Sequence, residues 1–191
     1  MLVVATSLGV ACSNGSGETQ QRTTVPTAPA LTTTTNPYAV PEVIDAAYAN
    51  RVLAGIDMAV GDMLRHVIAA GRIDQETIDR MEALYSESAF TEQMNLLIQD
   101  SVEGFPGYRP EGNPRTAVSE LITARPECIF VRVDRDTSAV AVNPDPSSRE
   151  QYVGLKPLDR DRDPGLYNPT PWTTFWDGFM QDRSRPPDPC A

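Results

Sequence analysis

The chain has 191 residues and a formal net charge of -10, with 26 Asp and Glu residues against 16 Lys and Arg residues. A protein that binds the phosphate backbone of a nucleic acid needs clustered positive charge, so nucleic acid is not an expected partner. The same acidic charge disfavours adsorption to anionic lipid, and any membrane contact is expected to run through a covalent anchor.

The first element in chain order is an apolar leader, residues 1–11. It is too short to span a bilayer, and a cysteine and a polar run follow it at once. The segment Leu8-Gly9-Val10-Ala11-Cys12 resembles the lipobox of bacterial lipoprotein signals, which implies that Cys12 is acylated and becomes the first residue after cleavage. The leucine stands four residues before Cys12 and no positive charge precedes it, so we expect a truncated signal peptide. An apolar N-terminus with an ordinary core cysteine is the alternative.

Residues 12–36 are predicted to be the lipidated cysteine and a disordered tether. This stretch is dominated by Thr, Pro and Ala and has too few large apolar side chains to offset the entropy cost of ordering. The tether is either bare or carries O-linked sugar in its Thr-rich part. Residues 37–191 then form a single domain of ordinary size.

The chain has three cysteines, Cys12, Cys128 and Cys190, and an odd number in a secreted protein needs an explanation. Lipidation of Cys12 would leave an even pair, for which a disulfide is the default expectation in an oxidising compartment. A bond between Cys128 and Cys190 would fasten the C-terminal tail, which has almost no apolar side chains, to the domain. Two unpaired thiols are the alternative.

Three helices are predicted in the first half of the domain. Residues 41–70 carry the strongest pattern, with apolar side chains at three- and four-residue spacing. Pro41 suits the first turn of this helix, and Gly71 is placed to cap its far end. The second helix is predicted to start at Asp74, and the third to cover residues 91–103.

Strands are predicted in the second half, after a loop rich in Pro and Gly at residues 105–114. The expected strands are residues 118–123, 128–134, 139–142, 152–157 and 171–179. Residues 136–138 form the turn before the third of them. Simple alternation in the last strand predicts that Trp172 and Trp176 share one side.

Helices followed by antiparallel strands indicate the α+β class. The economical packing is one curved sheet around the long first helix, which resembles the cystatin-like and NTF2-like folds. The chain also resembles lipoproteins of actinobacterial envelopes at Cys128-Ile129-Phe130-Val131, Tyr152-Val153-Gly154-Leu155, Asn168-Pro169-Thr170-Pro171-Trp172, Asp177-Gly178 and the terminal Pro-Pro-Asp-Pro-Cys190. This resemblance covers about residues 41–190 and implies an envelope location without an established activity. Fold likeness alone does not decide function.

Few residues point to chemistry. His66 is the only histidine, so any Ser/His/Asp or Cys/His mechanism would have to use it. No serine lies in a nucleophile-elbow pattern, and His66 is either an acid or base in a pocket or an ordinary boundary histidine. Trp172 and Trp176 either line a ligand pocket or fill the core.

No metal site and no cofactor are expected. Residues 159–163, Asp-Arg-Asp-Arg-Asp, resemble the start of a calcium loop, but Pro164 and Thr170 replace its glycine and its bidentate glutamate. We interpret this stretch as a solvated charge run. The similar residues 134–136 are expected to shape a turn.

These features predict a non-enzymatic, lipid-anchored protein on the extracytoplasmic face of the cell membrane. Its membrane partner is the lipid bilayer, through the acyl chains on Cys12, and its domain is expected to bind another envelope protein or component. The alternative is an NTF2-like domain that binds or converts a small molecule in a hydrophobic cone that uses His66 and a carboxylate.

Overall fold

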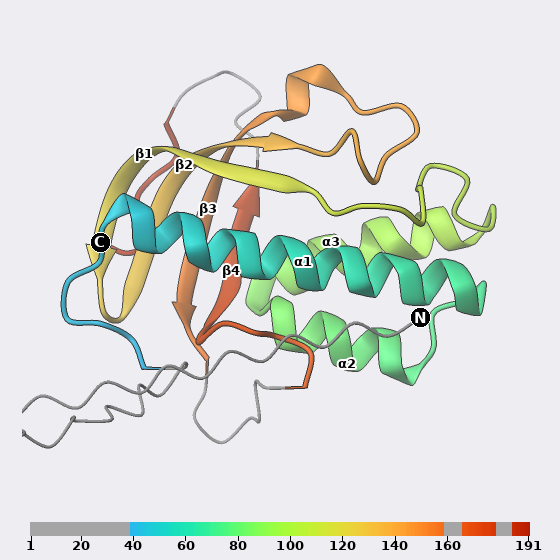
Figure 1. Ribbon diagram of the computed structural model, residues 1–191, viewed down its shortest axis with the longest axis horizontal. Coiled ribbons are helices and arrows are strands. Elements are labelled where there is room, and N and C mark those ends of the chain that lie inside the picture. The colour runs from blue at the N-terminus through green and yellow to red at the C-terminus, as the bar shows by residue number, and fades with distance from the viewer. Residues whose placement is uncertain (1–38, 159–165, 179–184) are drawn as a thin grey trace, which may run out of the picture. The chain divides into compact units, whose positions relative to one another are not determined.

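The computed structural model describes residues 39–158, 166–178 and 185–191. Within these ranges the chain forms three helices followed by four strands (Figure 1). The elements are α1 (Ala46–Ala70), α2 (Gln75–Leu84), α3 (Glu87–Ser101), β1 (Arg115–Arg125), β2 (Cys128–Asp136), a short 3-10 helix (Pro146–Ser148), β3 (Glu150–Pro157) and β4 (Trp172–Gly178). The strands form one antiparallel sheet in the order β1-β2-β3-β4. The α+β prediction is therefore confirmed.

Helix α1 begins after Asp45, so the predicted start at Pro41 is wrong. The Asp45 carboxylate accepts a hydrogen bond from the backbone N–H of Tyr48 at 2.7 Å, which satisfies a donor of the first turn and fixes the helix start. The predicted C-terminal cap is confirmed. Gly71 has a φ of +62°, and its N–H donates to the carbonyl of Val67 at 2.9 Å.

The apolar stripe of α1 packs on the inner face of the sheet, across which the helix lies in Figure 1. The stripe and the sheet interlock through buried side chains, among them Val52, Leu53, Ile56, Met63, Leu64 and Val67 of α1 and Ile129, Val131, Val133, Val153, Leu155 and Trp172 of the sheet. A fully buried large apolar side chain contributes roughly 1.5–3 kcal/mol. Burial at this interface therefore contributes substantially to the stability of the domain.

Helix α3 starts four residues earlier than the predicted residue 91 because of a contact with β4. The backbone N–H of Ser86 donates to the carbonyl of Thr174 at 2.9 Å, which anchors the residue before the helix to the sheet edge. Glu87 follows with a φ of +55°, a left-handed conformation that non-glycine residues rarely adopt. Its carboxylate pairs with Lys156 of β3. These contacts join residues far apart in the sequence.

Both edges of the sheet are partly covered. At the β1 edge, the N–H groups of Thr116 and Val118 donate to the side chains of Asp57 and Asn50 on α1, at 2.6 and 2.9 Å. Strand β1 also has two register shifts along its pairing with β2. Because bulges and side-chain partners blunt an edge strand, addition of a foreign strand is disfavoured here. At the other edge, the segment before α3 bonds to β4.

Residues 139–142 do not form the predicted return strand. The Val140 N–H bonds to the carbonyl of Thr137, and the Val142 N–H bonds to the carbonyl of Gly107, each at 2.9 Å. The segment therefore turns and pairs with the Pro/Gly-rich loop, and one isolated bridge joins Tyr108 to Ala141. The strand that pairs with β2 is instead β3.

Candidate functional site

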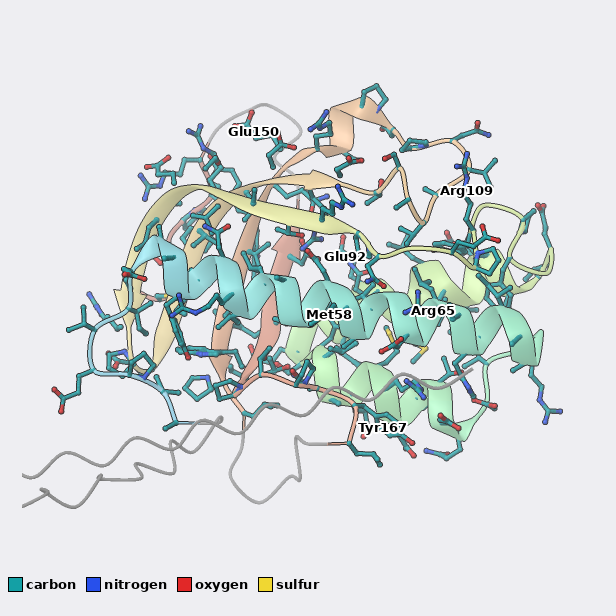
Figure 2. All side chains as sticks on the ribbon, viewed as in Figure 1. Met58, Arg65, Glu92, Arg109, Glu150 and Tyr167 are labelled. Atoms are coloured by element: carbon teal, nitrogen blue, oxygen red, sulfur yellow. A yellow bond between two sulfur atoms is a disulfide. The ribbon has the colours of Figure 1, made fainter. Side chains whose placement is uncertain are left out.

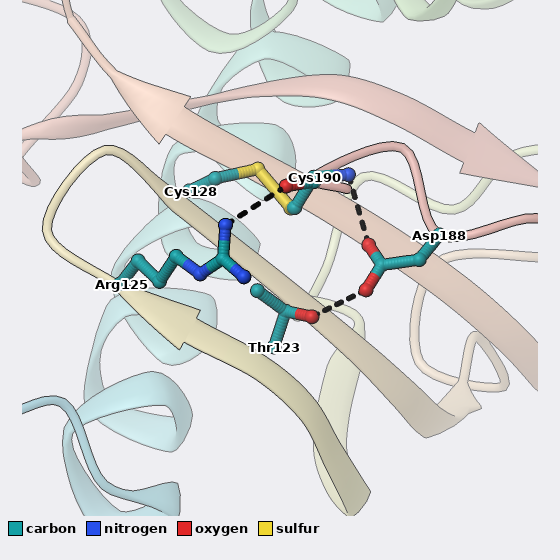
Figure 3. The surroundings of a disulfide bond; sticks show 5 residues. All are labelled: Thr123, Arg125, Cys128, Asp188 and Cys190. Carbon is teal, nitrogen blue, oxygen red and sulfur yellow. Dashed lines mark hydrogen bonds between the residues drawn. A yellow bond between two sulfur atoms is a disulfide. The ribbon is translucent and has the colours of Figure 1, made fainter.

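Cys128 and Cys190 form a disulfide, with their Cα atoms 5.8 Å apart (Figure 3). Hydrogen bonds hold the same tail beside β1. The Thr123 hydroxyl donates to the Asp188 carboxylate, and Arg125 Nη1 donates to the Cys190 carbonyl at 3.4 Å (Figure 3). The expected covalent attachment of the C-terminus is present in the structure.

His66 lies near the end of α1 and binds the start of α2. Its Nε2 is 2.9 Å from Asp74 Oδ1, and its Nδ1 is 3.7 Å from Glu76 Oε1. Asp74 also caps α2 by accepting the Thr77 N–H at 2.9 Å. The hydrogen bond with His66, followed by those from Thr77, holds the pKa of the Asp74 carboxyl well below its ordinary value. In this position His66 joins two helices.

The structure places Trp172 and Trp176 on opposite faces of the sheet. Trp172 is fully buried against α1, and its indole N–H donates to the Tyr48 hydroxyl at 2.8 Å. The ring of Trp176 packs edge-to-face on Phe130, with centroids 5.8 Å apart, on the face turned away from α1. The prediction that the two tryptophans share one side is wrong, and they do not line a common pocket.

An extra residue in β4 explains this reversal. Leu155 pairs with Thr174 and Gly154 pairs with Trp176, so Phe175 has no partner in the ladder. One extra residue inverts the alternation of all following side chains. Gly154 makes room for the bulge, because a Cβ there would lie only 3.0 Å from two ring carbons of Phe175.

A buried charge cluster that the sequence analysis missed joins α1 to the sheet. Arg135 donates from Nη1 to Asp177 Oδ2 at 2.8 Å and from Nε to the Thr116 hydroxyl at 3.1 Å. Thr116 donates its N–H and its hydroxyl to the Asp57 carboxylate, at 2.6 and 2.8 Å. Through these four residues, the cluster links α1, β1, β2 and β4.

Burial determines the electrostatics of this cluster. Asp57 and Asp177 are 6% and 7% exposed. Burial raises the pKa of the Asp57 carboxyl above its ordinary value, although the Thr116 hydrogen bonds and the charge of Arg135 act in the opposite direction. Burial also raises the pKa of Tyr85, and the charge of Asp177 raises it further. The cluster therefore favours the neutral form of Asp57 more than water does.

We interpret the cluster as a structural cross-link, because its charged groups bind one another. The expectation that residues 134–136 shape a turn is wrong for Asp134 and Arg135, since β2 continues to Asp136, whereas the Asp136 carboxylate accepts the Ser138 N–H at 2.9 Å at the start of the turn that follows. Arg135 stands two residues after the buried Val133 and so belongs to the inward face. This alternation was the sequence signal that could have placed Arg135 inside.

The outer face of α3 is a separate feature and is largely solvent-exposed. Of the helix residues, only Ala89 and Leu97 are buried. A shallow, open depression lies on the helix surface beside Ser88, Thr91, Glu92, Asn95 and Leu96. We call the exposed residues Thr91, Glu92, Asn95, Leu96, Ile98 and Gln99 of α3, together with Val102 and Glu103 just after its end, the α3 outer face.

In the described part of the chain, no three His, Cys, Asp or Glu side chains are grouped to hold a metal ion. No helix within the same residues has both the length and the hydropathy needed to cross a bilayer. Cys12, the leader and the tether lie outside the described residues, as does the charge run at 159–163.

Comparisons with protein-family models, with curated proteins and with solved structures gave no match for this chain. The fold class and the disulfide therefore rest on the geometry of this chain alone.

Proposed function

We propose that this protein is lipid-anchored through Cys12 on the extracytoplasmic face of the cell membrane, and that its domain binds another envelope protein. The observation that carries this proposal is the Cys128–Cys190 disulfide. Disulfides persist in oxidising compartments and are rare in the cytosol. The bond uses two of the three cysteines and leaves Cys12, directly behind an apolar leader, as the thiol available for acylation.

The resemblance of the strand and tail motifs to lipoproteins of actinobacterial envelopes supports the same location. We also propose, on the basis of a long helix against a curved sheet, that the α+β domain is a cystatin-like or NTF2-like variant. Neither likeness brings an activity with it.

A binding role fits the described surface and core better than catalysis does. His66 is bonded to Asp74 between two helices, and the two tryptophans lie on opposite faces of the sheet. Core side chains pack in the space between α1 and the sheet, where a ligand cone would lie. The candidates for a small-molecule site are thus not brought together.

Mass spectrometry of the protein isolated from its native membranes tests the anchor. We expect a mature chain that begins at Cys12 and carries a diacylglyceryl group on its thiol. A Cys12→Ala variant should lose the acyl mass and leave the membrane fraction. An unmodified wild-type chain that begins at Met1 would refute the anchor, and free thiols at Cys128 and Cys190 in the same sample would remove the argument for the compartment.

A further inference from the structure

We infer that the C-terminal strap, residues 185–191, is a redox-released cover over an aromatic row on the outer face of the sheet. A dithiol that reduces the Cys128–Cys190 bond would free the strap and expose Phe130 while the domain stays folded. The inference rests on the proposed extracytoplasmic location, where the disulfide is the resting state. It adds a means of changing the surface that the domain presents.

The outer face, which is turned away from α1, carries an aromatic row of Phe130, Tyr152 and Trp176. The strand register places Phe130 opposite Gly154, and Gly154 opposite Trp176. The rings of Phe130 and Trp176 meet above Gly154, which has no side chain, with their centroids 5.8 Å apart. Tyr152 stacks on Phe130 with ring centroids also 5.8 Å apart. These two rings therefore cover Phe130 from the side of β3 and β4.

The strap lies on the β1 side of the same ring. Thr123 of β1 pairs with Phe130, so both side chains project from one face, and the Thr123 hydroxyl donates to the Asp188 carboxylate of the strap. Cys128 stands two residues before Phe130, so it also projects from this face, where it is bonded to Cys190. Phe130 is fully buried although it faces away from α1. We attribute this burial to the strap together with the two neighbouring rings.

The disulfide is the main attachment of the strap. No strap residue belongs to a strand, and only Pro186 of the strap is buried. The other contacts of the strap with the sheet, among the described residues, are polar pairs of exposed or half-exposed groups: Thr123 with Asp188, Arg125 with the Cys190 carbonyl, and Glu120 with Arg185. Such contacts contribute little against the conformational entropy of a free chain end. Reduction should therefore release the strap and leave the core between α1 and the sheet in place.

The chemistry is thiol–disulfide exchange with a dithiol. Cys190 is half-buried, whereas Cys128 is buried, so the first thiolate attacks Cys190 Sγ. The S–S bond breaks, and its electron pair leaves on Cys128 Sγ, which takes a proton from water. The second thiolate of the partner then attacks the partner's own sulfur in the mixed disulfide and releases Cys190, which takes the second proton. Two electrons and two protons reach the protein, and the dithiol becomes a disulfide.

Two opposite charges beside the disulfide should set the rate of this exchange. Arg125 pairs in register with Cys128, and its Nη1 donates to the Cys190 carbonyl at 3.4 Å, so its guanidinium group lies beside the disulfide (Figure 3). A positive charge here attracts the attacking thiolate and stabilises the thiolate that leaves. The Asp188 carboxylate, which accepts the Cys190 N–H at 2.8 Å, carries the opposing charge.

Reduction of the full 191-residue chain by dithiothreitol tests the inference. Alkylation with mass mapping follows the two cysteines, and NMR with a paramagnetic probe in the solvent follows the exposure of side chains. We expect reduction at a rate proportional to the dithiol concentration and unchanged by urea below the unfolding transition. The Phe130 ring should become accessible to the probe, while Trp172 stays protected in the core. The exposed Met58 on α1 (Figure 2) is the reference, accessible before and after reduction.

Variants separate the strap from a general loss of structure. Arg125→Gln should slow reduction about twofold to fivefold, with a smaller effect at high salt, and Asp188→Asn should speed it by a similar factor. Arg72→Gln, at an exposed arginine between α1 and α2, is the matched control and should leave the rate unchanged. Cys190→Ser should expose Phe130 without a reductant, and dithiothreitol should then have no further effect.

Three results would each overturn the inference: reduction only through global unfolding, a reduced chain in which Phe130 stays covered, and a reduced chain in which Trp172 loses its protection. Equal effects of Arg125→Gln and Arg72→Gln would refute the role of Arg125. All of these results leave the resting disulfide intact, so they refute the strap alone. The compartment and the anchor are refuted separately, by free thiols or an unacylated Cys12 in the native protein.

Discussion

Replacement of both Cys128 and Cys190 with alanine should remove a large share of the stability of the domain. The disulfide closes a loop with a sequence separation of 62 residues. In the chain-entropy model, closing such a loop lowers the conformational entropy of the unfolded chain by about 14 cal/mol/K. This decrease corresponds to a stabilisation of the folded state by about 4 kcal/mol at 25 °C. Domains of this size have total stabilities of roughly 5–15 kcal/mol. The expected loss of about 4 kcal/mol is an upper limit, because a tail that is freed from the disulfide also gains conformational entropy in the folded state.

Urea unfolding, followed by tryptophan fluorescence and circular dichroism, measures this loss. With a slope of about 2 kcal/mol/M, the midpoint should fall by up to about 2 M. Thr123→Val is the control for the non-covalent tail contacts, because it removes the hydrogen bond to Asp188 and leaves the disulfide. It should cost at most about 1.5 kcal/mol. A loss below about 1 kcal/mol for the double alanine variant, at an unchanged slope, would refute the loop-entropy reasoning.

Three further predictions concern the sheet and its buried cluster. Asp177→Asn removes the counter-charge of the largely buried Arg135 and should cost about 3–5 kcal/mol in urea unfolding; a loss below about 1 kcal/mol would contradict this role. Because the folded-state pKa of Asp57 is raised, its stabilising contribution is present below its unfolded pKa of about 3.9 and is lost as the pH rises through the folded-state pKa. The wild type should therefore lose stability relative to Asp57→Asn from pH 4 to pH 7, and a relative gain would show that the ionised form is favoured. Gly154→Ala should cost about 1–3 kcal/mol through its close approach to Phe175, and Phe175→Leu in the same chain should recover part of that loss if the contact is the cause.

The helical half of the fold could be predicted because its signals are local. The apolar repeat of α1 ends at Gly71, whose φ of +62° is the conformation that glycine adopts most readily. Asp74 caps α2 with a carboxylate three residues before the N–H that it binds. Such contacts join neighbours in the sequence, so the sequence pattern contains both partners.

Two of the errors arose where a backbone partner is distant in the sequence. Residues 139–142 have the composition of a strand, but their N–H groups bond to Thr137 and to the loop at Gly107. Helix α3 begins early because Ser86 bonds to Thr174, across the whole sheet-forming half of the chain. A propensity for a structure does not identify which distant group will satisfy the backbone.

Part of the candidate site was also accessible from the sequence. The cysteine count predicted the disulfide, because three cysteines with one assigned to an anchor leave a single possible pair. The α3 outer face was missed, although its residues are spaced as a helix, because the sequence does not show which of the two helix faces a sheet will cover.

The sequence by itself determined the class of fold, the presence of three helices, the helix ends at Gly71 and Asp74, and the pairing of the two domain cysteines, because each depends on residue periodicity, a local contact or residue count. The tertiary structure alone decided which side of the sheet each tryptophan occupies. An extra residue at Phe175, accommodated by the absent side chain of Gly154, inverts the alternation between Trp172 and Trp176. It also decided which carboxylate pairs with the largely buried Arg135, because that partner, Asp177, lies two strands away in the sheet.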